Sequence, residues 1–215
     1  MKFFTILFLA SVLFCCGKIN KRAVEGHVMN PITGLPIEGV KMSLVKTTNG
    51  LPGGEKTIGS AVTDANGYYK IEEKSMKAVY LQVNTFGNYH PIGWFKDGSY
   101  SGGNNFPIEK GDVQTVDFHA VPYGNLQRHV KNISCFNTFD EIKLYYDGAS
   151  KANYGYNIGM MTTLTGCIDI TTNPLKMTSD YHYFHWAVTK NGLTNTYYDT
   201  IFVNASGVTN LDIFY

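Results

Sequence analysis

The fold class follows from two stretches, GHVMNPITGLPIEGV (Gly26–Val40) and VTDANGYY (Val62–Tyr69). In the first stretch, glycines flank a proline-containing turn, and the residues before it alternate between apolar and polar types. In the second, Asp, Asn and Gly make a tight reversal, because Asp and Asn bond to their own backbone and Gly accepts a positive φ. The strands beside these turns present one apolar face each. Two stacked sheets can bury such faces, which predicts a β-sandwich.

The same alternation continues along the rest of the chain. It predicts strands at 24–29, 40–47, 56–63, 68–71, 79–84 and 116–120, and again at 126–131, 142–146, 167–170, 183–189, 197–203 and 211–215. Asn191-Gly192 is a strong signal for a two-residue hairpin. Turn-forming residues at 122–125 divide the two groups of strands. The sequence therefore predicts an all-β fold of two tandem antiparallel β-sandwich domains, at 23–122 and 123–215.

The residues Asp64–Gly67 also match the beginning of a calcium-binding loop. Such a loop needs further acidic residues at fixed spacings, and the sequence does not supply them. A tight turn is therefore the favoured interpretation of these residues.

The two quoted stretches resemble the carboxypeptidase regulatory-like, transthyretin-like family of β-sandwich domains. Members of that family commonly show Gly-x-Val, Thr-Gly-x-Pro-x-x-Gly-Val and Thr-Asp-x-x-Gly-x-Tyr in this order, and the likeness covers about residues 23–121. Asn30 stands where the family usually has Asp. The resemblance implies that the first domain is transthyretin-like (prealbumin-like) and serves for binding or spacing. The related hydrolases end in Tyr-Arg-Gly-Ser, whereas this chain has Leu211–Tyr215, so that activity is not implied.

The amino-terminal residues are typical of an export signal. Lys2 precedes an apolar run, Phe3–Phe14, which is too short to span a bilayer and which stops at Cys15 and Cys16. This arrangement resembles a bacterial lipoprotein lipobox of the Bacteroidetes type. It implies a signal peptide at 1–15, lipidation for which Cys16 is a better candidate than Cys15, a tether at 16–22 and attachment to the outer membrane, with the leaflet left open. The alternative is an ordinary secretory leader.

Composition limits the classes of partner. The chain has 215 residues with 18 basic and 17 acidic side chains, and removing a leader that contains Lys2 balances the two. Such a chain has no electrostatic attraction for polyanions, so we predict no nucleic-acid partner. Cys135 and Cys167 form a possible disulfide in an oxidising compartment, and two buried free thiols are the alternative. Their spacing does not indicate zinc.

The segment 86–107 is the main candidate for ligand binding. It is predicted to be a long loop, and it combines aromatic residues with glycines and asparagines. Its possible ligand-binding residues are Tyr89, Trp94, Phe95 and Tyr100. Their rings could stack on a sugar or peptide while amides bond its polar edges. The alternative, which we favour, is that the rings are packing elements.

No catalytic, metal-binding or cofactor-binding signature is present in the sequence, so we predict no enzyme activity, no metal and no cofactor. His182 and His185 lie an odd number of residues apart, which places them on opposite faces of a strand and prevents them from sharing a metal. The short pattern Asp199-Thr200-Ile201 resembles an acceptor site for Bacteroidetes O-glycosylation.

Taken together, these features predict a non-enzymatic, lipid-anchored envelope protein that acts as a binding or scaffold module. Its partners would be the membrane, through the amino-terminal lipid, and an envelope protein or glycan. The alternative is an accessory protein that captures polysaccharide or peptide for uptake through the aromatic loop 86–107.

Overall fold

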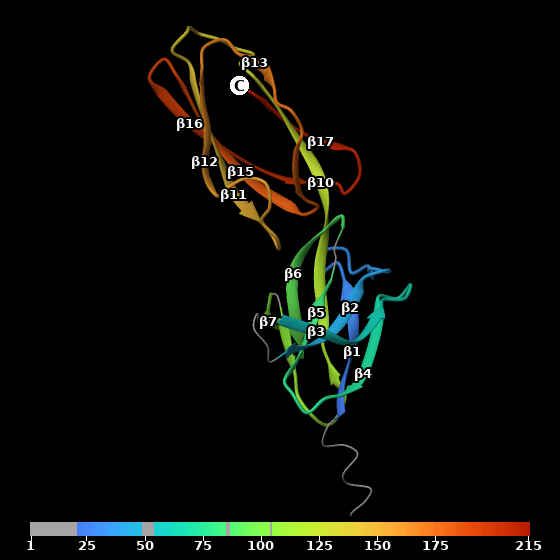
Figure 1. The fold of residues 1–215 in the computed structure, drawn as a ribbon. Coiled ribbons are helices and arrows are strands. Elements are labelled where there is room, and N and C mark those ends of the chain that lie inside the picture. The colour runs from blue at the N-terminus through green and yellow to red at the C-terminus, as the bar shows by residue number, and fades with distance from the viewer. Residues whose placement is uncertain (1–20, 49–53, 85–86, 104) are drawn as a thin grey trace, which may run out of the picture. The chain divides into compact units, whose positions relative to one another are not determined.

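The computed structural model describes residues 21–48, 54–84, 87–103 and 105–215 (Figure 1). Seventeen strands and no helix occur among these residues, which confirms the all-β prediction. None of them forms a helix that is long and apolar enough to cross a bilayer. The chain divides into two compact units. Unit 1 contains the described residues before position 88 together with 91–120, and unit 2 contains 88–90 and 121–215.

Unit 1 is a sandwich of two sheets. Its strands are β1 (Lys21–Met29), β2 (Lys41–Thr48), β3 (Gly54–Val62), β4 (Tyr68–Lys74), β5 (Val79–Val83), most of β6 (Tyr89–Lys96), β7 (Ser99–Gly102), β8 (Asn105–Ile108), β9 (Gln114–Thr115) and the first residues of β10 (Asp117–Lys131). One sheet has the order β4-β1-β10-β6-β7 with β9 beside β1, and the other has the order β3-β2-β5-β8. Both sheets contribute buried side chains, including Val24 and Phe118 from the first and Met42 and Leu81 from the second.

The turns that decided the fold class form as their chemistry predicts. The backbone N–H of Gly34 donates to the carbonyl of Asn30 at 2.8 Å, which closes the proline-containing turn. In the second turn, the Asp64 carboxylate accepts hydrogen bonds from the backbone N–H groups of Asn66 and Tyr68, both at 2.9 Å, and Gly67 has a φ of 71°. The Asp64 side chain is therefore used by its own turn, which confirms the turn interpretation.

Unit 2 is a second sandwich. Its strands are the remainder of β10, then β11 (Glu141–Ala149), β12 (Gly159–Thr165), β13 (Asp169–Thr171), β14 (Leu175–Thr178), β15 (Tyr181–Lys190), β16 (Leu193–Phe202) and β17 (Val208–Phe214). In one sheet β10 pairs with β13 and β14 in antiparallel fashion and with β17 in parallel fashion. The other sheet is antiparallel throughout, in the order β12-β11-β15-β16.

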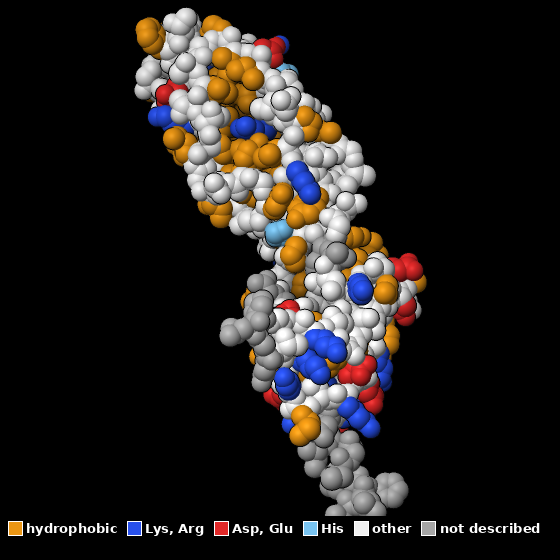
Figure 2. Space-filling view, viewed as in Figure 1, with side chains coloured by type: hydrophobic (Ala, Val, Ile, Leu, Met, Phe, Trp, Pro, Cys, Tyr) orange, Lys and Arg blue, Asp and Glu red, His pale blue; other side chains and the backbone are white. Residues whose placement is uncertain are grey.

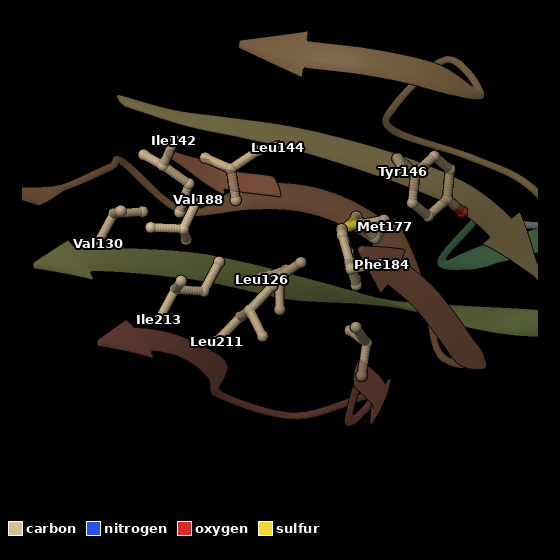
Figure 3. Close-up of a cluster of buried hydrophobic side chains, with 11 residues drawn as sticks. Leu126, Val130, Ile142, Leu144, Tyr146, Met177, Phe184, Val188, Leu211 and Ile213 are labelled. Carbon is tan, nitrogen blue, oxygen red and sulfur yellow. The ribbon is translucent and has the colours of Figure 1, made fainter. Parts of the chain in front are cut away.

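The core of unit 2 lies between its two sheets (Figure 3). Figure 3 shows Leu126 of β10 and Leu211 of β17 pointing toward Phe184 and Val188 of β15. Full burial of each such side chain is worth roughly 1.5–3 kcal/mol. The cluster contains Leu126, Val130, Ile142, Leu144, Tyr146, Met177, Phe184, Val188, Val203, Leu211 and Ile213.

Two segments differ from the sequence-based expectation. Residues 122–125, expected as a turn between domains, lie inside the 15-residue strand β10. Gly124 suits that strand because a Cβ at this position would lie 2.0 Å from the carbonyl oxygen of Asn204. Residues 86–107, expected as a long loop, contain strands β6, β7 and β8. Asp97 and Gly98 explain this difference: both have positive φ, and they form a two-residue hairpin turn between Lys96 and Ser99.

The parallel pairs were also not anticipated. β1 runs parallel to β9 and to β10, and β17 runs parallel to β10. Parallel neighbours are separated by long stretches of chain, so no turn motif marks them in the sequence.

Candidate functional site

Trp94 lies in the core of unit 1, which corrects its assignment as a possible ligand-binding residue. Its side chain is 0% exposed, and its ring meets the Phe118 ring edge-on with centroids 4.5 Å apart. The ring of Phe106 lies 6.3 Å away on β8. Because β6 is a paired strand and not a free loop, alternate residues point inward, and Trp94 is one of them. It supports the packing alternative.

The other three candidate residues of the segment have different surroundings. Phe95 is half-buried and stacks on His119, with ring centroids 3.9 Å apart. Tyr100 meets Phe95 edge-on at 5.7 Å and is 62% exposed, and Tyr89 is half-buried. Tyr100 is therefore the one exposed ring among the four, and a continuous aromatic platform does not form from them.

Two of the four cysteines, Cys135 and Cys167, lie within the described residues. Cys135 and Cys167 are joined in a disulfide, with Cα atoms 5.3 Å apart. This bond ties the loop after β10 to the segment before β13. Cys15 and Cys16 lie outside the described residues, as do the signal peptide and most of the tether.

His182 and His185 lie on opposite faces of β15, as the sequence predicted. His182 is fully buried, and its Nε2–H donates to the Thr178 carbonyl at 2.8 Å while its Nδ1 accepts the Tyr146 hydroxyl at 2.9 Å. Burial lowers the pKa of His182, opposed by the Thr178 carbonyl and by Asp180. A neutral imidazole satisfies both hydrogen bonds. His182 is therefore a structural residue of the core.

His185 belongs to an aromatic surface that we call the tyrosine face. The register between strands places its members in rows, because residues that are directly opposite in antiparallel strands point to the same side of the sheet. Tyr145 lies opposite His185, and His185 lies opposite Tyr198. The tyrosine face consists of Tyr145 and Asp147 on β11, Tyr181, Tyr183 and His185 on β15, and Tyr198 and Phe202 on β16.

The middle row of the tyrosine face is ordered by ring stacking and by a carboxylate. The Tyr145 and His185 rings are 3° from parallel with centroids 4.4 Å apart, and the Tyr198 ring lies 5.6 Å from His185 on the other side. Both carboxylate oxygens of Asp147 lie 2.8 Å from Nδ1 of His185. The imidazole is therefore fixed between two phenol rings, and Tyr198, which is 77% exposed, ends the row at the sheet edge.

This arrangement combines apolar ring surface with hydrogen-bonding groups. Tyr181, Tyr183 and Tyr198 are all exposed, and the strand register places them on one face of the sheet. Figure 2 shows exposed hydrophobic side chains, coloured orange, interspersed with white polar surface on unit 2. Tyrosine supplies a rigid apolar ring with a polar tip, which suits contact with a sugar or a protein. The tyrosine face is therefore the candidate binding site of unit 2.

No metal site accompanies the tyrosine face in the part of the chain that the structure describes. No group of three or more His, Cys, Asp or Glu side chains there lies close enough together to hold a metal.

Sequence reasoning examined one strand of the tyrosine face but missed the face itself. The segment Tyr181–Trp186 was weighed only for shared metal binding by its histidines. The Asn191-Gly192 hairpin was predicted, but its register was not followed outward: it fixes Lys190 opposite Leu193 and hence Tyr181 opposite Phe202 and His185 opposite Tyr198. The register of this hairpin was therefore available from the sequence.

Comparison with known proteins gives only distant likenesses. No protein-family model matches the chain, and a search of curated proteins finds no match. Among solved structures, a DUF3823 family protein from Bacteroides uniformis shows 11% identity and a TM-score of 0.35, covering 86% of this chain and 100% of that one. The minor pilin GBS52 of Streptococcus agalactiae shows 10% identity and a TM-score of 0.35, covering 90% and 94%.

A streptococcal ancillary pilin shows 13% identity and a TM-score of 0.33, covering 90% of this chain and 62% of its own length. TM-scores this low do not establish a shared topology, and nothing about function follows from them.

Proposed function

We propose that this protein is a non-enzymatic binding module of the cell envelope and that it contacts its partner through the tyrosine face. The observation that carries the proposal is the row Tyr145–His185–Tyr198, in which the half-buried His185 stacks on Tyr145 and bonds to Asp147 while Tyr198 is exposed. Prior fixing of rings reduces the conformational entropy that binding would otherwise cost. A scaffold without a binding face would gain nothing from exposing these rings.

A carbohydrate strand is the ligand class that we consider first. Rings pack against the C–H faces of sugars, while the Asp147 carboxylate and the hydroxyl of Thr200, which lies opposite Tyr183, can bond sugar hydroxyls. This proposal keeps the accessory role in polysaccharide capture but assigns binding to the tyrosine face instead of the segment 86–107. The segment 86–107 is a weaker candidate because Trp94 is buried and only Tyr100 of its four named residues is exposed.

A glycan array probed with the wild-type protein and two variants tests the proposal. Tyr183→Ala should reduce binding at least tenfold, and the matched variant Tyr100→Ala, which removes an exposed tyrosine from unit 1, should not reduce it. Equal loss in both variants, or loss in Tyr100→Ala alone, would contradict the tyrosine face as the site. Absence of binding by all three proteins would leave the scaffold role.

We further propose that the protein is anchored to the outer membrane by a lipid on Cys16. The support is the charged and apolar leader that stops at Cys15 and Cys16. Several acyl chains on one residue give firm attachment, whereas a single chain gives only marginal binding. Mass spectrometry of the amino-terminal peptide should find acyl chains in the wild type and in Cys15→Ser, and none in Cys16→Ser. An unmodified amino terminus in the wild type would refute the anchor.

The family of unit 1 is also a proposal. We infer that it is a carboxypeptidase regulatory-like, transthyretin-like domain, and the order of its turn motifs between Gly26 and Tyr69 supports this. Such a domain suits a spacer that carries a binding unit. An alignment of homologues that preserves those motifs across the first domain would test the assignment.

A further inference from the structure

We propose that a second copy of this chain pairs with the free edge of β16, in antiparallel orientation about a two-fold axis at Tyr198. β16 ends the order β12-β11-β15-β16, and no described strand pairs with its outer side. Eight consecutive residues of β16, 193–200, are exposed. The proposal concerns the strand edge, and it does not depend on whether the tyrosine face binds a glycan.

β16 lacks most of the features that usually protect an edge strand. It is ten residues long, contains neither proline nor lysine, carries one charged side chain, and keeps an unbroken register with β15 from Tyr181/Phe202 to Lys190/Leu193. Natural proteins normally blunt exposed edges with charges, prolines, bulges or short strands, because a long regular edge is a template for another chain.

Other edge strands show these protections clearly. β3 carries Glu55 and Lys56 and has a register shift in its pairing with β2. β12 has a register shift opposite Leu144/Tyr145. β4 carries Lys70, Glu72, Glu73 and Lys74 within seven residues. The long, regular edge of β16 is therefore the exception in this molecule.

Hairpin geometry shows which backbone groups of β16 face outward. In a two-residue hairpin the residues that flank the turn form a hydrogen-bonded pair, here Lys190 and Leu193, and such pairs alternate along an antiparallel ladder. The odd-numbered residues of β16 thus bond to β15. The N–H and C=O groups of the even-numbered residues point to the free edge: Thr194, Thr196, Tyr198, Thr200 and Phe202. In agreement, the backbone N–H of Thr200 donates to its neighbour Asp199 at 2.7 Å.

One symmetric register satisfies all of these outward groups. With Tyr198 opposite its own copy, Thr196 lies opposite Thr200 and Thr194 lies opposite Phe202 of the second chain. All five residues whose backbone groups point to the free edge then form hydrogen-bonded pairs. The two-fold axis is perpendicular to the sheet, so the tyrosine faces of both copies lie on the same side of the joined sheet. Asp199 lies opposite Tyr197, so no like charges face each other.

The same register extends the middle row of the tyrosine face. Tyr198 of one copy would lie beside Tyr198 of the other, so the rows Tyr145–His185–Tyr198 of both copies join at the axis. Cross-strand aromatic pairs contribute favourably to strand pairing. The hydrogen bond from the Thr200 N–H to Asp199 must break when the dimer forms, so Asp199 partly opposes pairing at this edge.

Cysteine cross-linking of the full chain in detergent tests the register. Cys15 and Cys16 are first replaced by serine, so that the engineered thiol is the free one. Tyr198→Cys places two thiols across the axis with Cα atoms about 5.5 Å apart, which a disulfide can bridge. It should give a covalent dimer under mild oxidation. Thr196→Cys should not, because its symmetry mate lies roughly 14 Å along the strand.

The oligomeric state supplies an independent measurement. Light scattering should find a dimer whose proportion rises with protein concentration. Thr196→Pro should give a folded monomer by circular dichroism, and Asp199→Ala should favour the dimer severalfold because it releases the Thr200 N–H. A wild-type chain that stays monomeric at all concentrations overturns the proposal. Cross-linking of Tyr197→Cys in place of Tyr198→Cys overturns the register.

Discussion

Tyr145 and His185 stack ring on ring across two neighbouring strands, with centroids 4.4 Å apart and planes 3° from parallel. Asp147 holds the same imidazole through Nδ1. The half-buried His185 ring is thus restricted from two directions, by Tyr145 and by Asp147. The orientation of the His185 ring within the tyrosine face is therefore set by these two contacts.

Replacing Asp147 by Ala should affect binding more than stability. The Asp147–His185 pair is partly exposed, and such pairs contribute about 0–1 kcal/mol to the free energy of unfolding. Urea denaturation should show a loss within that range, while glycan binding falls because the imidazole is no longer oriented. Glu72→Ala, which breaks the exposed pair with Lys21 in unit 1, is the matched control. A loss of several kcal/mol in Asp147→Ala would show a structural role.

Trp94 and Tyr100 should differ sharply when each is changed to Ala. Trp94 is buried against Phe118, and truncating a buried tryptophan costs about 3–5 kcal/mol. Tyr100 is 62% exposed, so its loss should change the unfolding free energy by about 0.5 kcal/mol or less. Thermal unfolding of both variants provides the comparison, and similar stabilities would contradict the packing of Trp94 described above.

Removing the disulfide should destabilise unit 2. Cys135 and Cys167 close a loop with a sequence separation of 32, which the chain-entropy model values at roughly 3 to 4 kcal/mol. In denaturant titrations, the free energy of unfolding of the double variant Cys135→Ser with Cys167→Ser should be lower by that amount, as should that of the wild type under reducing conditions. If the wild-type chain has the same stability with and without reductant, the two cysteines are not bonded in solution.

Acidification should destabilise the protein through His182. Burial lowers its pKa in the folded state below the ordinary value of 6.5, so the unfolded chain binds the proton more readily. The contribution of the neutral His182 to the free energy of unfolding is therefore complete above pH 6.5 and is lost as the pH falls toward the folded-state pKa. Unfolding free energies measured from about pH 7.5 down to about pH 5 should fall less in His182→Phe than in wild type.

His90 must be controlled in the same titration, because burial lowers its pKa as well. His90→Gln should remove a separate part of the pH dependence. A slope that is identical in wild type and His182→Phe would contradict the burial of a neutral imidazole at position 182.

Two glycines with the same backbone conformation should respond differently to alanine. Gly34 and Gly67 have φ values of 72° and 71°, but a Cβ at Gly34 meets open space, whereas one at Gly67 would lie 2.4 Å from the carbonyl oxygen of Val28. Gly34→Ala bears only the cost of left-handed backbone, about 1 kcal/mol. Gly67→Ala should lose clearly more in chemical denaturation, and equal losses would show that the Val28 carbonyl can move aside.

Local chemistry made the turns and most of the strands predictable. The residue types at Asp64–Gly67 and Asn191-Gly192 specify tight turns, because Asn and Gly tolerate positive φ. The alternation beside these turns shows which residues face the core. The predicted strand at 142–146 lies within β11, the one at 116–120 overlaps β10 from Asp117 onward, and the inward residues Phe118 and Leu144 are buried.

Long-range pairing was not predictable from the same signals. The alignment of β1 with β10 joins Val28 to Phe118, and no local pattern in either strand specifies the other. The candidate site was missed for a related reason. Tyr145 comes to His185 through pairing of β11 with β15, and only the β15–β16 half of the tyrosine face is fixed by a turn.

The parallel pairing of β10 with β17 sets an order of events during protein synthesis. β10 ends at Lys131, but Leu211 and Ile213 of β17 reach the ribosome exit long after it, and both complete the core beside Leu126 and Val130. Until they emerge, one side of β10 and the apolar interior of unit 2 remain open, which exposes the nascent chain to misassociation. Unit 1 can close much earlier in translation. The core of unit 2 therefore closes only when β17 joins β10, whereas unit 1 does not depend on that strand.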